Sequence, residues 1–227
     1  MNNQLPAYLQ SVAAWQYVFG YNYFYLTQEP SSPLDSSYSV YGFQKYFGYS
    51  CNVMVLAIAS VYGLSLLLVC LSAVTTKTPS RRLRSGGFIL LNEVGFALVT
   101  FSTPNIVTAV CVEFQAGTIL DTSVFWSKAF LCMGVVSIIV SNIIGVINAE
   151  ESSDVGTFFR LHSKLGVYAA VLFNLRLVLL TIFIFLNQAV GSVGSYLLII
   201  FQCSYIIFVV FGRPHKKPYD LVRSLIL

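Results

Sequence analysis

Residues Val53–Thr75 read VMVLAIASVYGLSLLLVCLSAVT, an apolar run that contains no charged side chain. A transmembrane α-helix needs about 20 consecutive apolar residues to cross the hydrocarbon core of a bilayer. The run therefore predicts a membrane-spanning helix, and this helix sets the expected class of the protein.

The composition of the 227-residue chain agrees with a membrane protein. Apolar residues make up 56% of it, charged residues make up 10%, and the mean hydropathy is +0.75. A soluble domain is usually about half apolar and about a quarter charged. So few charges do not cover this much apolar surface in water, and lipid is the solvent that the composition fits.

Further apolar runs along the chain predict additional spans. They cover Gly87–Val112, Phe125–Asn148, Lys164–Leu186 and Val190–Gly212. The uncharged segment Tyr8–Leu26 is rich in Tyr, Phe and Trp, so it either crosses the membrane or lies in the interface; we expect it to cross. The predicted fold class is all-α, a polytopic transmembrane helix bundle with five or six spans. Its last two helices, joined by Asn187–Ala189, form an antiparallel hairpin.

The chain divides into three predicted regions. Residues 1–51 hold the aromatic N-terminal segment and an outer loop, Glu29–Tyr49, that is rich in Pro, Ser, Gly and Tyr. Residues 52–212 form the helix bundle. Residues 213–227 form a basic tail on the cytosolic or matrix side.

Basic residues gather on one side of the predicted bundle. Ten of the 13 lie in the loop Thr76–Gly86, in the loop from Ala149 up to and including Lys164, or after Gly212. Because loops rich in Lys and Arg remain cytosolic, these segments are predicted to face the cytosol or an organellar matrix. The residues expected to act as topology signals or to lie at lipid headgroups are Arg81, Arg82, Arg84, Arg213, Lys216 and Lys217. Nucleic acid is not an expected partner, because the clusters flank membrane spans.

Two ionisable side chains, Glu93 and Arg176, fall inside predicted spans. Such groups are costly in lipid and are therefore candidates for function. At about 1.5 Å per residue, Arg176 lies ~18 Å and Glu93 ~9 Å from the cytosolic end, so their side chains can bridge the offset if their helices touch. Asn174 and Gln202 lie at a depth similar to that of Arg176. This intramembrane polar cluster either lines a polar pathway or clamps the helices together by hydrogen bonds, and we favour the clamp.

The sequence offers no recognisable catalytic equipment. Its two histidines, His162 and His215, flank spans, and its five cysteines form no CxxC pair. Transmembrane haem needs paired axial ligands inside the bundle, and a metal ion needs a cluster of ligands. No catalytic residue, metal site or cofactor is therefore predicted, and we expect the protein not to be an enzyme.

Four stretches share short motifs with one known family. They are FQKYFGYSCNVMVLAIA (Phe43–Ala59), FILLNEVGFALV (Phe88–Val99), LFNLRLVLLTIFIFL (Leu172–Leu186) and LLIIFQCSYIIFVVFGRPHKKPYDL (Leu197–Leu221). In this order they resemble the TRP-like multi-pass membrane domain at the C-terminal end of large protist surface proteins and, more distantly, fungal TRP-like membrane proteins. That family tends to carry a glutamate at the position of Glu93, two adjacent arginines where Arg176 stands alone, and an Arg-Pro exit like Arg213–Pro214. It usually also has a large ectodomain and a further helix.

The resemblance implies a non-catalytic integral membrane protein of the plasma or ciliary membrane, either channel-related or a membrane anchor. The alternative is a structural accessory subunit of a larger membrane complex, such as a protist respiratory assembly in the mitochondrial inner membrane. Subunits of that kind are small, hydrophobic and poor in motifs, as this chain is. The expected partners are membrane lipids and other membrane subunits.

Overall fold

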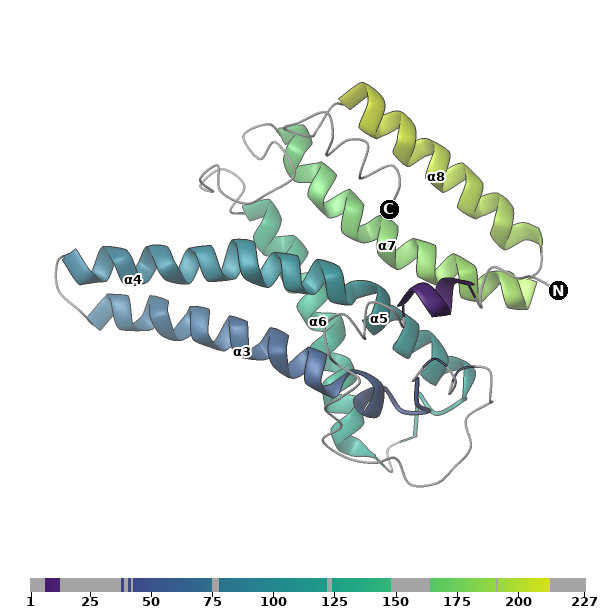
Figure 1. Cartoon of the computed structure of the whole chain (residues 1–227), viewed down its shortest axis with the longest axis horizontal. Coiled ribbons are helices and arrows are strands. Elements are labelled where there is room, and N and C mark those ends of the chain that lie inside the picture. Colours follow the sequence, from purple (N-terminus) through teal and green to yellow (C-terminus); the bar gives the residue numbers. More distant parts are fainter. Residues whose placement is uncertain are drawn as a thin grey trace.

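The described part of the chain is helical. The computed structural model describes residues 7–12, 38, 41, 43–74, 78–121, 124–147, 164–190 and 192–212, and no strand occurs within these ranges. Its helices are α3 (Phe47–Val74), α4 (Thr78–Ile89), the π-helical segment η2 (Leu90–Gly95), α5 (Phe96–Gln115), α6 (Phe125–Ile147), α7 (Lys164–Val190) and α8 (Ser192–Gly212), shown in Figure 1. A short helix also covers residues 7–12. The predicted all-α class is confirmed for this part of the chain.

Three of these helical stretches are long and apolar enough to cross a membrane. They are Phe47–Val74, Arg81–Gln115 and Phe125–Ile144. Two shorter apolar stretches, Val171–Leu186 and Ser195–Phe211, lie within α7 and α8. The apolar runs of the sequence therefore do form helices, and their lengths indicate a membrane-associated protein.

α4, η2 and α5 follow one another without a break and form one long helix. At about 1.5 Å per residue, residues 78–115 extend over about 57 Å, nearly twice the ~30 Å hydrocarbon core. The prediction of a loop over Thr76–Gly86 is therefore wrong for most of its length, because residues 78–86 are helical. Pro79 suits the first turn of a helix, where its missing N–H has no intrahelical partner, and the arginines that follow are good helix formers.

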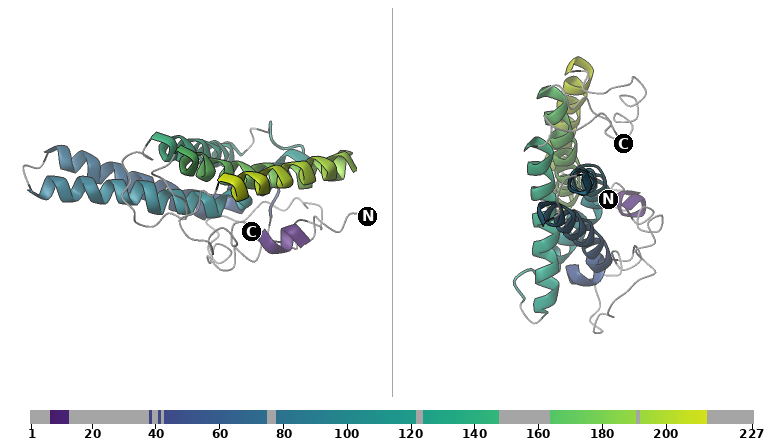
Figure 2. Two further views of the ribbon diagram at one scale, coloured as in Figure 1. Left: turned by 90° about the horizontal axis from the view of Figure 1, so that it is seen from above. Right: turned by 90° about the vertical axis from the view of Figure 1, so that its left-hand side faces the viewer.

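The helices are arranged as two antiparallel pairs connected through α5 and α6. α3 packs along α4, α7 packs along α8, and α6 packs against α3, α5 and α7. Figure 1 shows the α3–α4 pair projecting to one side of the molecule and the α7–α8 pair above α5. Figure 2 shows the same ribbon from two further directions.

The core lies where α3, α5 and α6 cross. Phe47, Met54 and Ile58 of α3 are buried there together with Ile106 of α5. Gly134 allows α6 to approach closely, because a Cβ atom at this position would lie 2.9 Å from Cζ of Phe47. This crossing fixes the three helices at the end of the bundle where α3 begins.

Three boundaries differ from the sequence predictions. α3 begins at Phe47, so the end of the predicted outer loop is already helical. The predicted connection Asn187–Ala189 lies in the last turn of α7, which ends at Val190, and α8 begins at Ser192.

The predicted aromatic span falls only partly within the described residues. Leu9 and Val12 of the short N-terminal helix are buried against the bundle. The rest of Tyr8–Leu26, most of Glu29–Tyr49 and the tail 213–227 lie outside the described residues.

Candidate functional site

The first turn of α3 is capped by side chains from two other helices. The first N–H groups of any helix lack intrahelical partners, and α3 has no acidic residue in its first turn. The N–H of Phe47 donates to Oε2 of Glu113 on α5 at 3.0 Å, and the N–H of Gly48 donates to Oγ of Ser127 on α6 at 2.8 Å. A carboxylate at this position also offsets the positive end of the helix dipole.

Glu113 forms an ion pair with Lys128 of α6. The Glu113 side chain is fully buried, whereas the Lys128 side chain is 17% exposed. Nζ of Lys128 also donates to the carbonyl oxygen of Thr118 at 2.6 Å. One carboxylate therefore joins the start of α3, the end of α5 and the first turns of α6.

The backbone after α5 brings Thr118 into this contact. Gly117 has a positive φ of 69°, and its N–H bonds the carbonyl of Phe114 at 3.0 Å. The N–H of Thr118 returns to the carbonyl of Glu113 at 3.2 Å, which completes a glycine-terminated helix end. The Thr118 hydroxyl then donates to the carbonyl oxygen of Lys45 at 3.3 Å, and Lys45 lies just before the start of α3.

A second layer of contacts covers the ion pair. The Tyr46 hydroxyl donates to Oδ2 of Asp121 at 2.9 Å. The Nζ atoms of Lys45 and Lys128 lie 5.6 and 5.9 Å from the centre of the Tyr46 ring. We call the residues that make these contacts the capping cluster: Lys45, Tyr46, Glu113, Thr118, Asp121, Ser127 and Lys128.

The sequence prediction did not identify the capping cluster, because Glu113 and Lys128 stand at the ends of apolar runs and resemble loop charges. Helical periodicity carries a signal, since Ile106, Ala109 and Glu113 follow at spacings of three and four residues and therefore share one face. Ile106 and Ala109 are fully buried, so the carboxylate points into the same core.

Polar side chains also join α6, α7 and α8 to one another. Nδ2 of Asn174 donates to Oδ1 of Asn142 at 3.1 Å, which connects α7 to α6. Nε of Arg176 donates to Oε1 of Gln202 at 2.9 Å, which connects α7 to α8. The Arg176 guanidinium also lies 4.6 Å from the ring centre of Tyr205.

The four predicted cluster residues are thus distributed over separate contacts. Asn174 and Arg176 are two positions apart, about 200° around a helix, so they meet different neighbours. Glu93 lies in η2 and is half-buried. Lys128 and Glu113 form an ion pair, whereas among the described residues Glu93 is not paired with Arg176.

A hydroxyl contact connects the N-terminal helix to the bundle. The hydroxyl of Tyr8 lies 2.5 Å from Oγ1 of Thr181 on α7, and Thr108 on α5 donates to it at 3.5 Å. Thr181 and Thr108 also bond carbonyls of their own helices.

The basic residues predicted for the headgroup region are divided by the limits of the described residues. Arg81, Arg82 and Arg84 are exposed on α4, and the Arg84 guanidinium lies 5.7 Å from the ring centre of Phe88. Arg213, Lys216 and Lys217 lie outside the described residues.

Comparisons with known proteins add no assignment. The chain matches no protein-family model, no curated protein and no solved structure. Within the described ranges, no three His, Cys, Asp or Glu side chains are close enough together to hold a metal ion.

Proposed function

We propose that the chain is a non-catalytic, multi-pass membrane subunit that serves as a scaffold within a larger membrane assembly. On this proposal α3, the α4–α5 helix, α6, α7 and α8 are its five spans, with Tyr8–Leu26 as a sixth. The observation that carries the proposal is the use of the intramembrane polar side chains. Asn174, Arg176 and Gln202 connect neighbouring helices of this chain in pairs, whereas Glu93 is not paired with Arg176.

Each pair joins a different set of elements. Asn142–Asn174 connects α6 with α7, Arg176–Gln202 connects α7 with α8, and Glu113–Lys128 connects α5 with α6. Interhelical hydrogen bonds in lipid contribute about 0.6–2 kcal/mol each, enough to fix which helices are neighbours. Such pairs explain why costly polar groups occur in the spans without requiring transport.

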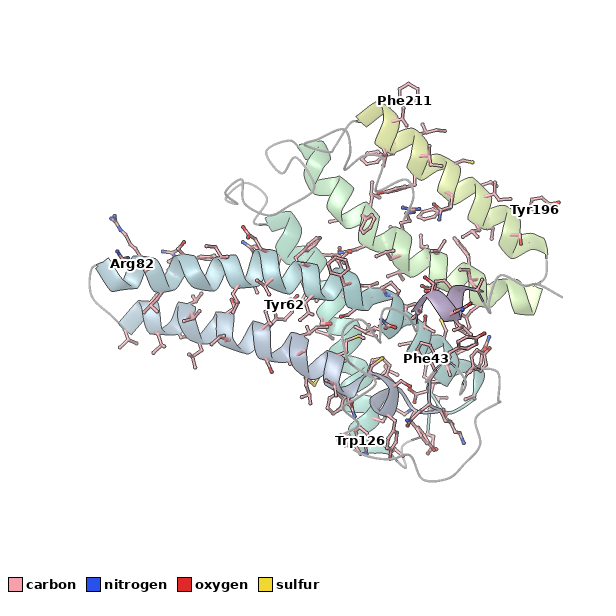
Figure 3. All side chains as sticks on the ribbon, in the orientation of Figure 1. Phe43, Tyr62, Arg82, Trp126, Tyr196 and Phe211 are labelled. Carbon is pink, nitrogen blue, oxygen red and sulfur yellow. The ribbon has the colours of Figure 1, made fainter. Side chains whose placement is uncertain are left out.

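The apolar surface left open supports an association with other membrane helices. α8 packs along α7, and its remaining surface exposes large apolar side chains. They are Val193, Tyr196, Leu197, Ile199, Ile200, Ile206, Ile207, Val210 and Phe211. Figure 3 shows Tyr196 and Phe211 pointing away from the rest of the bundle. A face of this kind fits the transmembrane helices of neighbouring subunits.

Arg176→Leu separates a scaffold from a pathway. Full-length wild type and variant are extracted from their native membrane in a mild detergent and sized on a native gel, and the purified chains are tested for ion flux in liposomes. We expect wild type to run as a complex much larger than 25.1 kDa without carrying ions, and the variant to lose the complex. A wild-type monomer that conducts ions would overturn the proposal.

A second function, the TRP-like channel-related bundle, is favoured by η2. π-helical turns inside α-helices often occur at functional sites, and this one carries the carboxylate of Glu93 in a predicted span. If Glu93 lies on an ion pathway, Glu93→Gln abolishes cation flux into liposomes and leaves the native complex intact. No flux in wild type would exclude this second function.

A further inference from the structure

The free end of the α3–α4 pair exposes two kinds of side chain. We call residues 63–74 of α3 and residues 78–89 of α4 the arm. Arg81, Arg82 and Arg84 are exposed on its α4 side, and Figure 3 shows Arg82 at the tip. On its α3 side, Leu66 is 66% exposed and Leu67 is 53% exposed. α4 packs mainly against α3 among the described residues, so these side chains are not covered by the bundle.

A close contact fixes the register between the two helices of the arm. The Ser65 hydroxyl donates to the carbonyl oxygen of Gly87 at 2.8 Å. A Cβ atom at Gly87 would lie 2.9 Å from Cγ2 of Val69, so the backbones approach closely here. Because the helices are antiparallel, Arg84 and Arg81 lie level with the last turns of α3, beyond Val69.

The length of α3 places these arginines at the membrane surface. A hydrocarbon core of ~30 Å accommodates about 20 helical residues, and the uncharged run Val53–Thr75, which has about this length, ends where α3 ends. A tilt of about 20° shifts this limit by about one residue. The two leucines therefore lie in hydrocarbon, and the arginines of α4, level with the last turns of α3, reach the headgroup layer beyond them.

The charge of the arm is of one sign. α4 contains three arginines and no acidic residue, and its sequence is TPSRRLRSGGFI. A guanidinium binds phosphate oxygens with two parallel N–H groups and is weakly hydrated, so it suits phosphate in a partly dehydrated layer.

We propose that the arm binds the phosphate groups of anionic lipids in the leaflet that it reaches, through Arg81, Arg82 and Arg84. Leu66 and Leu67 anchor it among the acyl chains beside those headgroups. The proposal holds for a scaffold and for a channel-related bundle alike, because it depends only on the arm and its depth.

The test is a lipid titration of the full-length chain in detergent, with bound phosphatidylglycerol or phosphatidylcholine counted by native mass spectrometry. We expect wild type to prefer phosphatidylglycerol. R81Q/R82Q/R84Q should lower the affinity for it at least about fivefold, the loss expected for a single arginine at an anionic surface. R81K/R82K/R84K keeps the charge but loses the paired N–H groups, so its affinity should lie between those of wild type and the glutamine variant, which also shows that substituted α4 still folds.

A matched control removes the same number of charges elsewhere. R213Q/K216Q/K217Q removes three of the four basic side chains of the predicted tail. These residues are also expected near headgroups, so we expect this variant to lower phosphatidylglycerol binding, but clearly less than R81Q/R82Q/R84Q does. An equal loss in this variant would show a net-charge effect and overturn the proposal. Equal affinity of wild type for the two lipids, or displacement of the lipid by inorganic phosphate at the same concentration, would also overturn it.

Discussion

Glu113 shows how one side chain can hold three helices at their ends. Its carboxylate accepts from the N–H of Phe47 and from Nζ of Lys128, which come from α3 and α6. Burying a carboxylate is costly unless it is paired and hydrogen-bonded, and both conditions are met here. The start of α3, which its own sequence leaves uncapped, is stabilised by this carboxylate.

Lys128→Met tests the ion pair between Lys128 and Glu113. The substitution leaves the Glu113 carboxylate buried without its cation, so we expect the free energy of unfolding to fall by about 3–5 kcal/mol. Reversible unfolding in mixed micelles, followed by circular dichroism, measures the change. Adding Glu113→Gln should restore part of the loss, because the buried charge is then removed.

Arg82→Met is the matched control, since it also removes one cation, but an exposed one, and should change the free energy by less than about 0.5 kcal/mol. A Lys128→Met protein as stable as this control would show that the pair does not hold the helices.

Asn174→Leu tests the contact between α6 and α7. Asn174 is completely buried and donates to Asn142, so its loss should cost about 0.6–2 kcal/mol. The double variant Asn142→Leu/Asn174→Leu should be less destabilised than the sum of the single variants, because neither amide is then left without its partner. Strict additivity in the same unfolding assay would contradict a direct contact.

Counting residues along the sequence predicted how far along its helix each polar residue lies. It did not predict toward which neighbouring helix each side chain points. Counting residues gave Arg176 and Gln202 a similar depth, and the structure joins them by a hydrogen bond. Depth carries no information on rotation, so it did not reveal that Asn174 faces α6 while Arg176 faces α8. Glu113 was missed because a charge at the end of an apolar run looks like the start of a loop.

Among the helices, α3 and α6 approach each other closely at the first turn of α3. A Cβ atom at Gly48 would lie 2.6 Å from Cζ3 of Trp126 and 2.8 Å from Cα of Ser127. The second contact is with backbone, so α6 would have to move. Gly63 of the same helix has nothing within 4 Å of such an atom.

Gly48→Ala should therefore lower the free energy of unfolding by about 1–3 kcal/mol, the usual cost of overpacking. Gly63→Ala is the matched control and should be neutral or stabilising by up to about 1 kcal/mol, because Ala is the better helix former. Both are measured by the same micellar unfolding. Equal effects of the two substitutions would show that the α3–α6 approach is not tight.

The apolar runs predicted the helices because length and hydrophobicity determine what lipid accommodates. The extension of α4 beyond its apolar run was not predicted, since Pro79 and the neighbouring arginines look like a loop when judged by hydropathy. η2 was not predicted either, because LLNEVG has no residue that requires a π-helical turn.

The whole molecule consists of a core and two helix pairs that project from it. α3, α5 and α6 cross tightly at the capping cluster, whereas the arm and α8 expose apolar side chains. The core explains why the chain folds, and the exposed surfaces are where we propose lipids and other subunits bind. On the proposed scaffold, the contacts Asn142–Asn174 and Arg176–Gln202 hold α7 and α8 to the core and form no hydrated path.

The accessibility of Asn174 to water distinguishes a dry contact between helices from a hydrated path. The five native cysteines are replaced, and Asn174→Cys, Gln202→Cys and Arg82→Cys chains are treated in membranes with a small water-soluble thiol reagent. If the contacts made by Asn174 and Gln202 are dry clamps between helices, Arg82→Cys reacts and neither of the other two variants does. Reaction of Asn174→Cys or Gln202→Cys at a rate close to that of Arg82→Cys would contradict the account and indicate a water-filled pathway through the bundle.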